Sequence, residues 1–127
     1  MYRKMKPFSV LARIKSFFYA GRGIKFMIES QHNAWLHALA TILIITAGFL
    51  IGINIAEWGL IILSIIAVWT AEALNTALEF LADVSSSEPN PLVMKAKDIA
   101  AAAVLIAAAG ALAIGLIIFI PYLAELV

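Results

Sequence analysis

The chain has 127 residues, of which 64% are hydrophobic and only 13% charged, and its mean hydropathy is +1.00. This composition leaves too little polar surface for a soluble core and excludes a water-soluble globular domain, so we expect a small integral membrane protein with a single domain over residues 1–127. The absence of cysteine excludes disulfides and thiolate metal sites, and a net charge of +1 gives no support to nucleic-acid binding.

An amphipathic helix is predicted over about residues 8–31. Apolar residues alternate with basic residues along this stretch: Val10, Ile14, Phe17, Phe18, Ile24 and Met27 with Arg13, Lys15, Arg22 and Lys25. The pattern is typical of a helix that lies at the membrane interface and turns its cations toward anionic headgroups. A basic anchor that only fixes the orientation of the protein is the alternative interpretation.

Three apolar segments follow, at about residues 34–55, 58–82 and 99–122. Each is close to the roughly 20 residues that cross a 30 Å hydrocarbon core, so we expect three transmembrane helices in an all-α fold. Residues 52–57 are expected to form a tight turn, and residues 85–91, rich in serine and proline, a longer loop. No cleavable signal peptide is expected before the first span.

The basic residues predict the orientation of the protein. All nine lie in the N-terminal segment or just before the third span: Arg3, Lys4, Lys6, Arg13, Lys15, Arg22, Lys25, Lys95 and Lys97. By the positive-inside rule both segments are cytoplasmic. We therefore expect a multi-pass protein of the cytoplasmic (inner) membrane with a cytoplasmic N-terminus and an external C-terminus.

The second apolar segment carries the candidate site. Glu72, Asn75, Glu79 and Asp83 are spaced so that they fall within an arc of roughly 80° on one helix face. An ionisable side chain at the membrane centre costs about 2.5–3.5 kcal/mol, which favours a functional role. Residues 58–71 give about 21 Å of uncharged helix, so Glu72 is expected near the cytoplasmic headgroups and the other carboxylates closer to the cytosol.

Lys97 and Asp98 are expected to open the third transmembrane helix. The free amides and positive dipole at a helix start suit phosphate, with Lys97 as a mobile cation, although Asp98 as a simple N-cap is an alternative. Carboxylates for Mg²⁺, a base near an alcohol and a cation for phosphate are the groups that phosphoryl transfer requires.

Other classes of function remain open from the residues alone. The stripe of carboxylates could mark the ion pathway of a small transporter or channel subunit, although the first and third spans have no matching charges. A non-catalytic membrane scaffold would leave the stripe unexplained. Glu79 and Asp83 could also form structural ion pairs with Arg22 or Lys25.

Residues 72–83 (EALNTALEFLAD) and 95–104 (KAKDIAAAAV) resemble the signature of the prokaryotic membrane-integral diacylglycerol kinases and undecaprenol kinases. The resemblance extends from about Phe17 to Ile118. It implies a homotrimer of three-span protomers that transfers the γ-phosphoryl group of MgATP to the primary hydroxyl of a membrane lipid. Diacylglycerol and undecaprenol are not distinguished by the sequence, although Asn33 and His37 look more like the undecaprenol-type branch.

The resemblance also implies roles for individual residues. Glu72 would be the general base on the lipid hydroxyl, Asn75 belongs to the same catalytic motif, and Glu79 would hold the Mg²⁺ ion bound to ATP. The residues that match the nucleotide-contacting positions are Tyr19, Asp83, Glu88, Asn90, Lys97 and Asp98.

One position departs from the family pattern. Gln31 stands where the family has a glutamate that serves as the second metal ligand, and Glu29 is rotated by about 200° on a helix, so it cannot easily replace it. We expect looser metal binding. His32 and His37 do not share a helix face and make a weak metal pair, so His37 is interpreted as a polar residue of the membrane interface.

Overall fold

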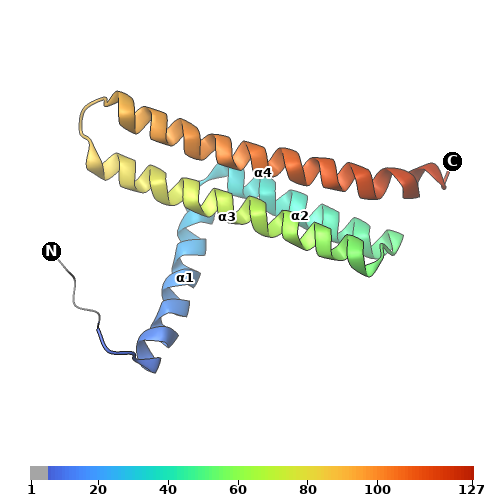
Figure 1. Ribbon diagram of the computed structural model, residues 1–127, viewed down its shortest axis with the longest axis horizontal. Helices are drawn as coiled ribbons and strands as arrows, with labels where there is room; N and C mark the ends of the chain where they lie inside the picture. Colours follow the sequence, from blue (N-terminus) through green and yellow to red (C-terminus); the bar gives the residue numbers. More distant parts are fainter. Residues whose placement is uncertain (1–5) are drawn as a thin grey trace.

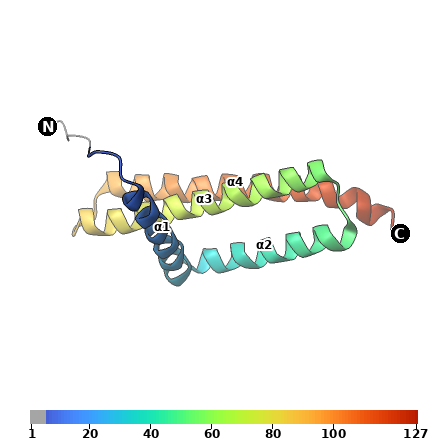
Figure 2. The ribbon, with the colours of Figure 1, turned by 90° about the horizontal axis from the view of Figure 1, so that it is seen from below.

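The computed structural model describes residues 6–127, and over this range the chain forms four helices, α1 (Val10–Ser30), α2 (His32–Ile51), α3 (Ile55–Ser85) and α4 (Pro91–Ala124). Helices α2, α3 and α4 are each long and apolar enough to cross a membrane, which confirms the all-helical prediction with three spans. They run side by side, and α1 crosses them at a steep angle (Figures 1 and 2). The predicted cytoplasmic cations Arg3 and Lys4 lie outside the described residues.

Gln31 separates α1 from α2. Its backbone is extended (φ −121°, ψ 115°), and its N–H donates to the Met27 carbonyl at 3.0 Å, which caps the last turn of α1. The Gln31 carbonyl in turn accepts from the Ala34 N–H at 3.2 Å in the first turn of α2. This single extended residue changes the direction of the chain and leaves the Gln31 side chain at the corner where α1 meets α3.

A tight turn joins α2 to α3. Gly52 adopts the left-handed conformation (φ 77°) that favours glycine at a helix C-terminus. Asn54 then caps α3: its side chain accepts from the Glu57 N–H at 3.0 Å, and the Glu57 carboxylate accepts from the Asn54 N–H at 2.9 Å. The first span therefore ends at Ile51 instead of the expected residue 55, because the glycine stops the helix.

Helices α3 and α4 continue beyond the apolar segments and extend past α1 (Figure 2). Helix α4 begins at Pro91, and the Asn90 side chain caps it by accepting from the Leu92 N–H at 2.9 Å. The predictions that Lys97 and Asp98 open this helix, and that Asp98 caps it, are therefore wrong. Hydropathy marks the part of a helix that meets lipid, whereas proline and asparagine mark where the helix starts.

The helix core lies toward the α2–α3 turn. Its buried residues are Ile53, Ile61, Ile118 and Phe119, and the Trp58 ring packs against them. Gly48 lets α2 approach this ring, because an added Cβ would lie 2.8 Å from it. Most other large apolar side chains of the three spans are exposed, as expected for a surface that contacts lipid.

Candidate functional site

The four polar residues of the stripe on α3 run from a buried to an exposed environment. Glu72 is 0% exposed and Asn75 is 5% exposed, Glu79 is half-buried and Asp83 is exposed. Glu72 and Asn75 are therefore covered within a single protomer. Helices α1 and α2 both pack against α3, so a single chain already covers these two residues.

Glu72 has an unusual environment for a buried carboxyl group. Among residues 6–127, neither of its side-chain oxygens has a hydrogen-bond partner. Across the helix interface, Nε2 of His37 in α2 lies 3.3 Å from Glu72 Oε2. This contact is not an aligned hydrogen bond, so the buried His37 Nε2 and Glu72 Oε2 both remain unsatisfied among the described residues.

His37, interpreted from the sequence as a polar residue of the membrane interface, packs between α2 and α3. Its side chain is only 16% exposed and faces Glu72. The sequence contains a signal for this placement, since His37 and Thr41 are four residues apart and share one face of a mostly apolar helix. A buried carboxyl group on a neighbouring helix requires such a polar face.

A small network fixes His37 against α3. Thr41 Oγ1 donates to the His37 carbonyl at 2.7 Å, and Trp69 Nε1 donates to Thr41 Oγ1 at 3.1 Å. The imidazole also packs edge-on against the Trp69 ring, with centroids 6.4 Å apart and an interplanar angle of 68°. These contacts tie α2 to α3 one turn away from Glu72.

Gln31, Asn75 and Glu79 form a second cluster, toward the α3–α4 loop. Gln31 Nε2 donates to Glu79 Oε2 at 2.7 Å, and Asn75 Nδ2 donates to Glu79 Oε1 at 3.3 Å. The structure thus brings together the two residues proposed for metal binding. Glu29 does not join them; it pairs with Lys25 at 3.6 Å on the exposed surface of α1.

This second cluster contains the kind of donor atoms that Mg²⁺ prefers. Within residues 6–127 no group of three or more histidine, aspartate or glutamate residues could hold a metal. Glu79 nevertheless offers a carboxylate, and Asn75 Oδ1 is a buried oxygen without a hydrogen-bond partner. Gln31 would add a third oxygen if its amide turned over. These residues fit a cation held mainly by oxygen, with only one charged protein ligand.

The predicted nucleotide-contacting residues are only partly assembled. Lys97 Nζ lies 3.2 Å from Asp83 Oδ1, which links α4 to α3. Asn90 caps α4, and Ser86 Oγ donates to the Glu88 carbonyl in the loop between the two helices. The alternative pairing of Asp83 with Arg22 or Lys25 is wrong in the described part of the chain, because Asp83 pairs with Lys97.

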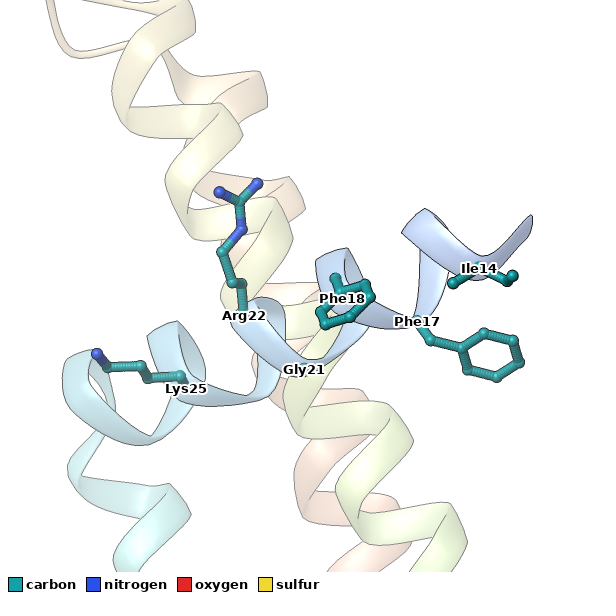
Figure 3. Close-up of a pocket in the computed structure, with 6 residues that line it drawn as sticks. All are labelled: Ile14, Phe17, Phe18, Gly21, Arg22 and Lys25. Atoms are coloured by element: carbon teal, nitrogen blue, oxygen red, sulfur yellow. The ribbon is translucent and has the colours of Figure 1, made fainter. Parts of the chain in front are cut away.

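Helix α1 carries the remaining predicted contact, Tyr19. The Arg22 guanidinium carbon lies 5.1 Å from the centre of its ring, an arrangement typical of a cation–π interaction. Figure 3 shows Arg22 pointing along α3 toward its Ser85 end, whereas Phe17 points away from the helix bundle. No hydrogen bond or ion pair among residues 6–127 joins Tyr19 to the cluster around Lys97.

Comparisons with known proteins agree with these features. The family model of prokaryotic diacylglycerol kinase matches residues 18–119. The undecaprenol kinase of Bacillus subtilis is 41% identical over 109 residues, which is 86% of this chain and 89% of that protein.

Two diacylglycerol kinases are also similar to the chain. The one from Synechocystis is 34% identical over 112 residues, which is 87% of this chain and 64% of that protein. The one from Helicobacter pylori is 36% identical over 104 residues, or 81% of this chain and 79% of that protein. These similarities favour an enzyme over the transporter and scaffold alternatives. The chain belongs to the prokaryotic diacylglycerol kinase family and is a multi-pass membrane lipid kinase.

Proposed function

We propose that this lipid kinase transfers the γ-phosphoryl group of MgATP to the primary hydroxyl of a membrane lipid. The observation that supports this most strongly is Glu72, a completely buried carboxyl group on a membrane-spanning helix without a hydrogen-bond partner on either oxygen. A buried group of this kind is unfavourable unless a ligand or a chemical step uses it.

In the proposed reaction the lipid oxygen attacks the γ-phosphorus while Glu72 accepts the hydroxyl proton. A new bond forms between the lipid oxygen and phosphorus, and the bond from the γ-phosphorus to the bridging oxygen of ADP breaks. Asn75, one turn along α3 and also buried, orients the groups around this centre. General-base catalysis of this kind contributes about 10²–10⁴-fold to a rate.

The nucleotide is proposed to bind between the second cluster and the α3–α4 loop. Glu79, with Asn75 and Gln31, would hold a Mg²⁺ ion, which neutralises the phosphate charge when bound. Lys97 lies on the same side of the molecule and can leave Asp83 to reach a phosphate oxygen, because its side chain is 40% exposed. Glu88, Asn90, Asp98 and Tyr19 are proposed nucleotide contacts through the family resemblance.

The acceptor is proposed to be an isoprenoid or glyceride alcohol, with undecaprenol as the first candidate. Its support is the relative from Bacillus subtilis, which is named undecaprenol kinase and is more similar in sequence than the two diacylglycerol kinases. An apolar groove of about 300 Å³ between α1 and α3 includes Met27 and Thr76. Because Thr76 is one turn from Glu72, a hydrocarbon chain in this groove could present its hydroxyl to the base.

Helix α1 is proposed to lie at the cytoplasmic interface. Phe17 and Phe18 are 79% and 72% exposed, and Arg22 points toward the Ser85 end of α3 (Figure 3). In this position the exposed aromatic rings would lie in the headgroup region, and the basic side chains would point toward the cytosol. The homotrimer is proposed from the family resemblance alone, since one protomer already buries Glu72.

The proposal is tested with purified protein in lipid bilayers supplied with ATP labelled at the γ-phosphate. We expect Mg²⁺-dependent label in undecaprenol, diacylglycerol or both when each lipid is added in turn. Ion flux across the same liposomes without any labelled lipid would contradict the proposal.

A further inference from the structure

We infer that His37 is a positioning residue that holds the Glu72 carboxylate in its reactive orientation, an inference that rests on the proposed role of Glu72 as the base. Its ring nitrogen Nε2 lies 3.3 Å from Glu72 Oε2, on the neighbouring helix. Glu72 Oε1 is also buried and has no hydrogen-bond partner among residues 6–127. One oxygen thus lies beside the imidazole, and the other is a buried acceptor that a lipid hydroxyl entering the site could use.

The need for such a partner follows from burial. Glu72 is 0% exposed, so water cannot stabilise its charge or restrict its rotation. Helix α4 provides no help, because residues 99–122 contain no charged side chain. Among the described residues, His37 is the one basic group within 4.0 Å of Glu72. A small rotation of either side chain would convert the present contact into an aligned hydrogen bond.

The network around His37 supports a positioning role more than a packing role. The bond from Trp69 Nε1 to Thr41 Oγ1 already joins α2 to α3 without the imidazole. Trp69 also contacts the imidazole edge-on and so limits where the ring can lie, whereas Thr41 bonds to the backbone carbonyl of His37. A ring held in this way meets the requirement that a catalytic carboxylate be oriented before substrate binds.

The experiment compares His37→Leu, which removes the donor, with His37→Gln, whose amide Nε2 can occupy the position of the imidazole Nε2. For His37→Leu we expect kcat to fall by about 10–100-fold, the size of a hydrogen bond to a charged group, with KM for ATP unchanged. His37→Gln should recover most of this loss. Thr46→Val is the matched control, because exposed Thr46 bonds only to the Ile42 carbonyl of its own helix.

A double variant that combines His37→Leu with Glu72→Gln separates a failure of this inference from a failure of the proposed function. If His37 acts through Glu72, adding His37→Leu to Glu72→Gln should cause no further loss of the residual rate. If Glu72→Gln is slow and His37→Leu retains wild-type kcat, the inference fails and the proposed function stands. Wild-type turnover by Glu72→Gln would instead overturn the proposed function and, with it, this inference.

Two further results would also overturn the role of His37. These are an equal loss in His37→Leu and His37→Gln, or a loss in the double variant that multiplies the two single losses. Should His37→Leu fail to fold, His37→Asn replaces it, since the shorter amide cannot reach Glu72. We then expect His37→Gln to be faster than His37→Asn, and equal rates would contradict the inference.

Discussion

Glu57 and Glu72 belong to the same membrane-spanning helix, α3, but their carboxyl groups have opposite surroundings. Glu57 Oε2 accepts hydrogen bonds from the Asn54 N–H at 2.9 Å and from the Tyr122 hydroxyl at 2.7 Å. Both oxygens of Glu72 lack a hydrogen-bond partner in the described part of the chain, although this residue is the more deeply buried of the two. Glu57 caps its helix and ties α3 to α4, and so has a structural role.

The difference teaches which of the two carboxyl groups is available for chemistry. A carboxylate with satisfied hydrogen bonds stabilises the fold, whereas a buried one without them destabilises it and is retained for another reason. Glu79 is intermediate, because both of its oxygens accept from neutral amides that a cation could displace.

Glu79→Gln should give the largest change outside Glu72. It removes the single charged ligand of the proposed metal site and one of the two oxygens that accept from Gln31 and Asn75. We expect the Mg²⁺ concentration for half-maximal rate to rise by roughly tenfold or more. The control is Glu29→Gln, an exposed residue paired with Lys25, which should leave the Mg²⁺ dependence unchanged. An unaltered Mg²⁺ dependence in Glu79→Gln would remove this residue from the metal site.

Gln31→Glu should have the opposite and smaller effect. The new carboxylate would replace an amide that lies 2.7 Å from Glu79, so the two charges repel each other when no metal is present. With ATP and Mg²⁺ the divalent cation outweighs this repulsion, and we expect half-maximal rate at a severalfold lower Mg²⁺ concentration.

The thermal stability of Gln31→Glu tests whether charge repulsion with Glu79 underlies its altered Mg²⁺ dependence. The melting temperature of Gln31→Glu should fall in the metal-free protein and recover with Mg²⁺, unlike that of the wild type. If neither the Mg²⁺ dependence nor the melting temperature responds, Gln31 does not take part in metal binding.

Tyr122→Phe tests the structural role of Glu57. It removes the hydroxyl that donates to Glu57 and leaves the Asn54 cap in place. We expect a melting temperature a few degrees lower and an unchanged rate of lipid phosphorylation, measured at saturating ATP and lipid. A slower phosphorylation step in a stable variant would show that this end of α3 also affects the chemistry.

Lys97→Met should have the smallest effect on stability. The ion pair with Asp83 is 40% and 70% exposed on its two side chains, so its loss should change the free energy of unfolding by less than about 1 kcal/mol. KM for ATP should nevertheless rise severalfold if Lys97 contacts phosphate. The combination of a large loss of stability and an unchanged KM would assign Lys97 to the fold.

The sequence predicted the three spans and the stripe on α3 because both depend on properties along one helix. Hydropathy identifies a span, and steps of three and four residues place Glu72, Asn75 and Glu79 on one face. The ends of α3 and α4 were less predictable, because these helices continue beyond the expected membrane region. The start of α4 depends on Asn90 and Pro91, which the expected loop of residues 85–91 included.

Contacts between helices were the part that the sequence predicted least. The partner of Glu72 is set by how α2 packs on α3. The sequence pattern within α2 alone therefore did not predict that His37 faces Glu72. The proximity of Gln31 and Glu79 was predicted only because the family resemblance linked two positions 48 residues apart. Periodicity on a single helix contains no such information.

The most direct measurement compares Glu72→Gln with Glu57→Gln in single-turnover transfer from labelled ATP to lipid in bilayers. Both changes replace a carboxylate by an amide of the same shape on the same helix. We expect Glu57→Gln to label lipid at nearly the wild-type rate and Glu72→Gln to be at least about 10²-fold slower, with ATP bound equally well by both. Wild-type labelling by Glu72→Gln would contradict its assignment as the base.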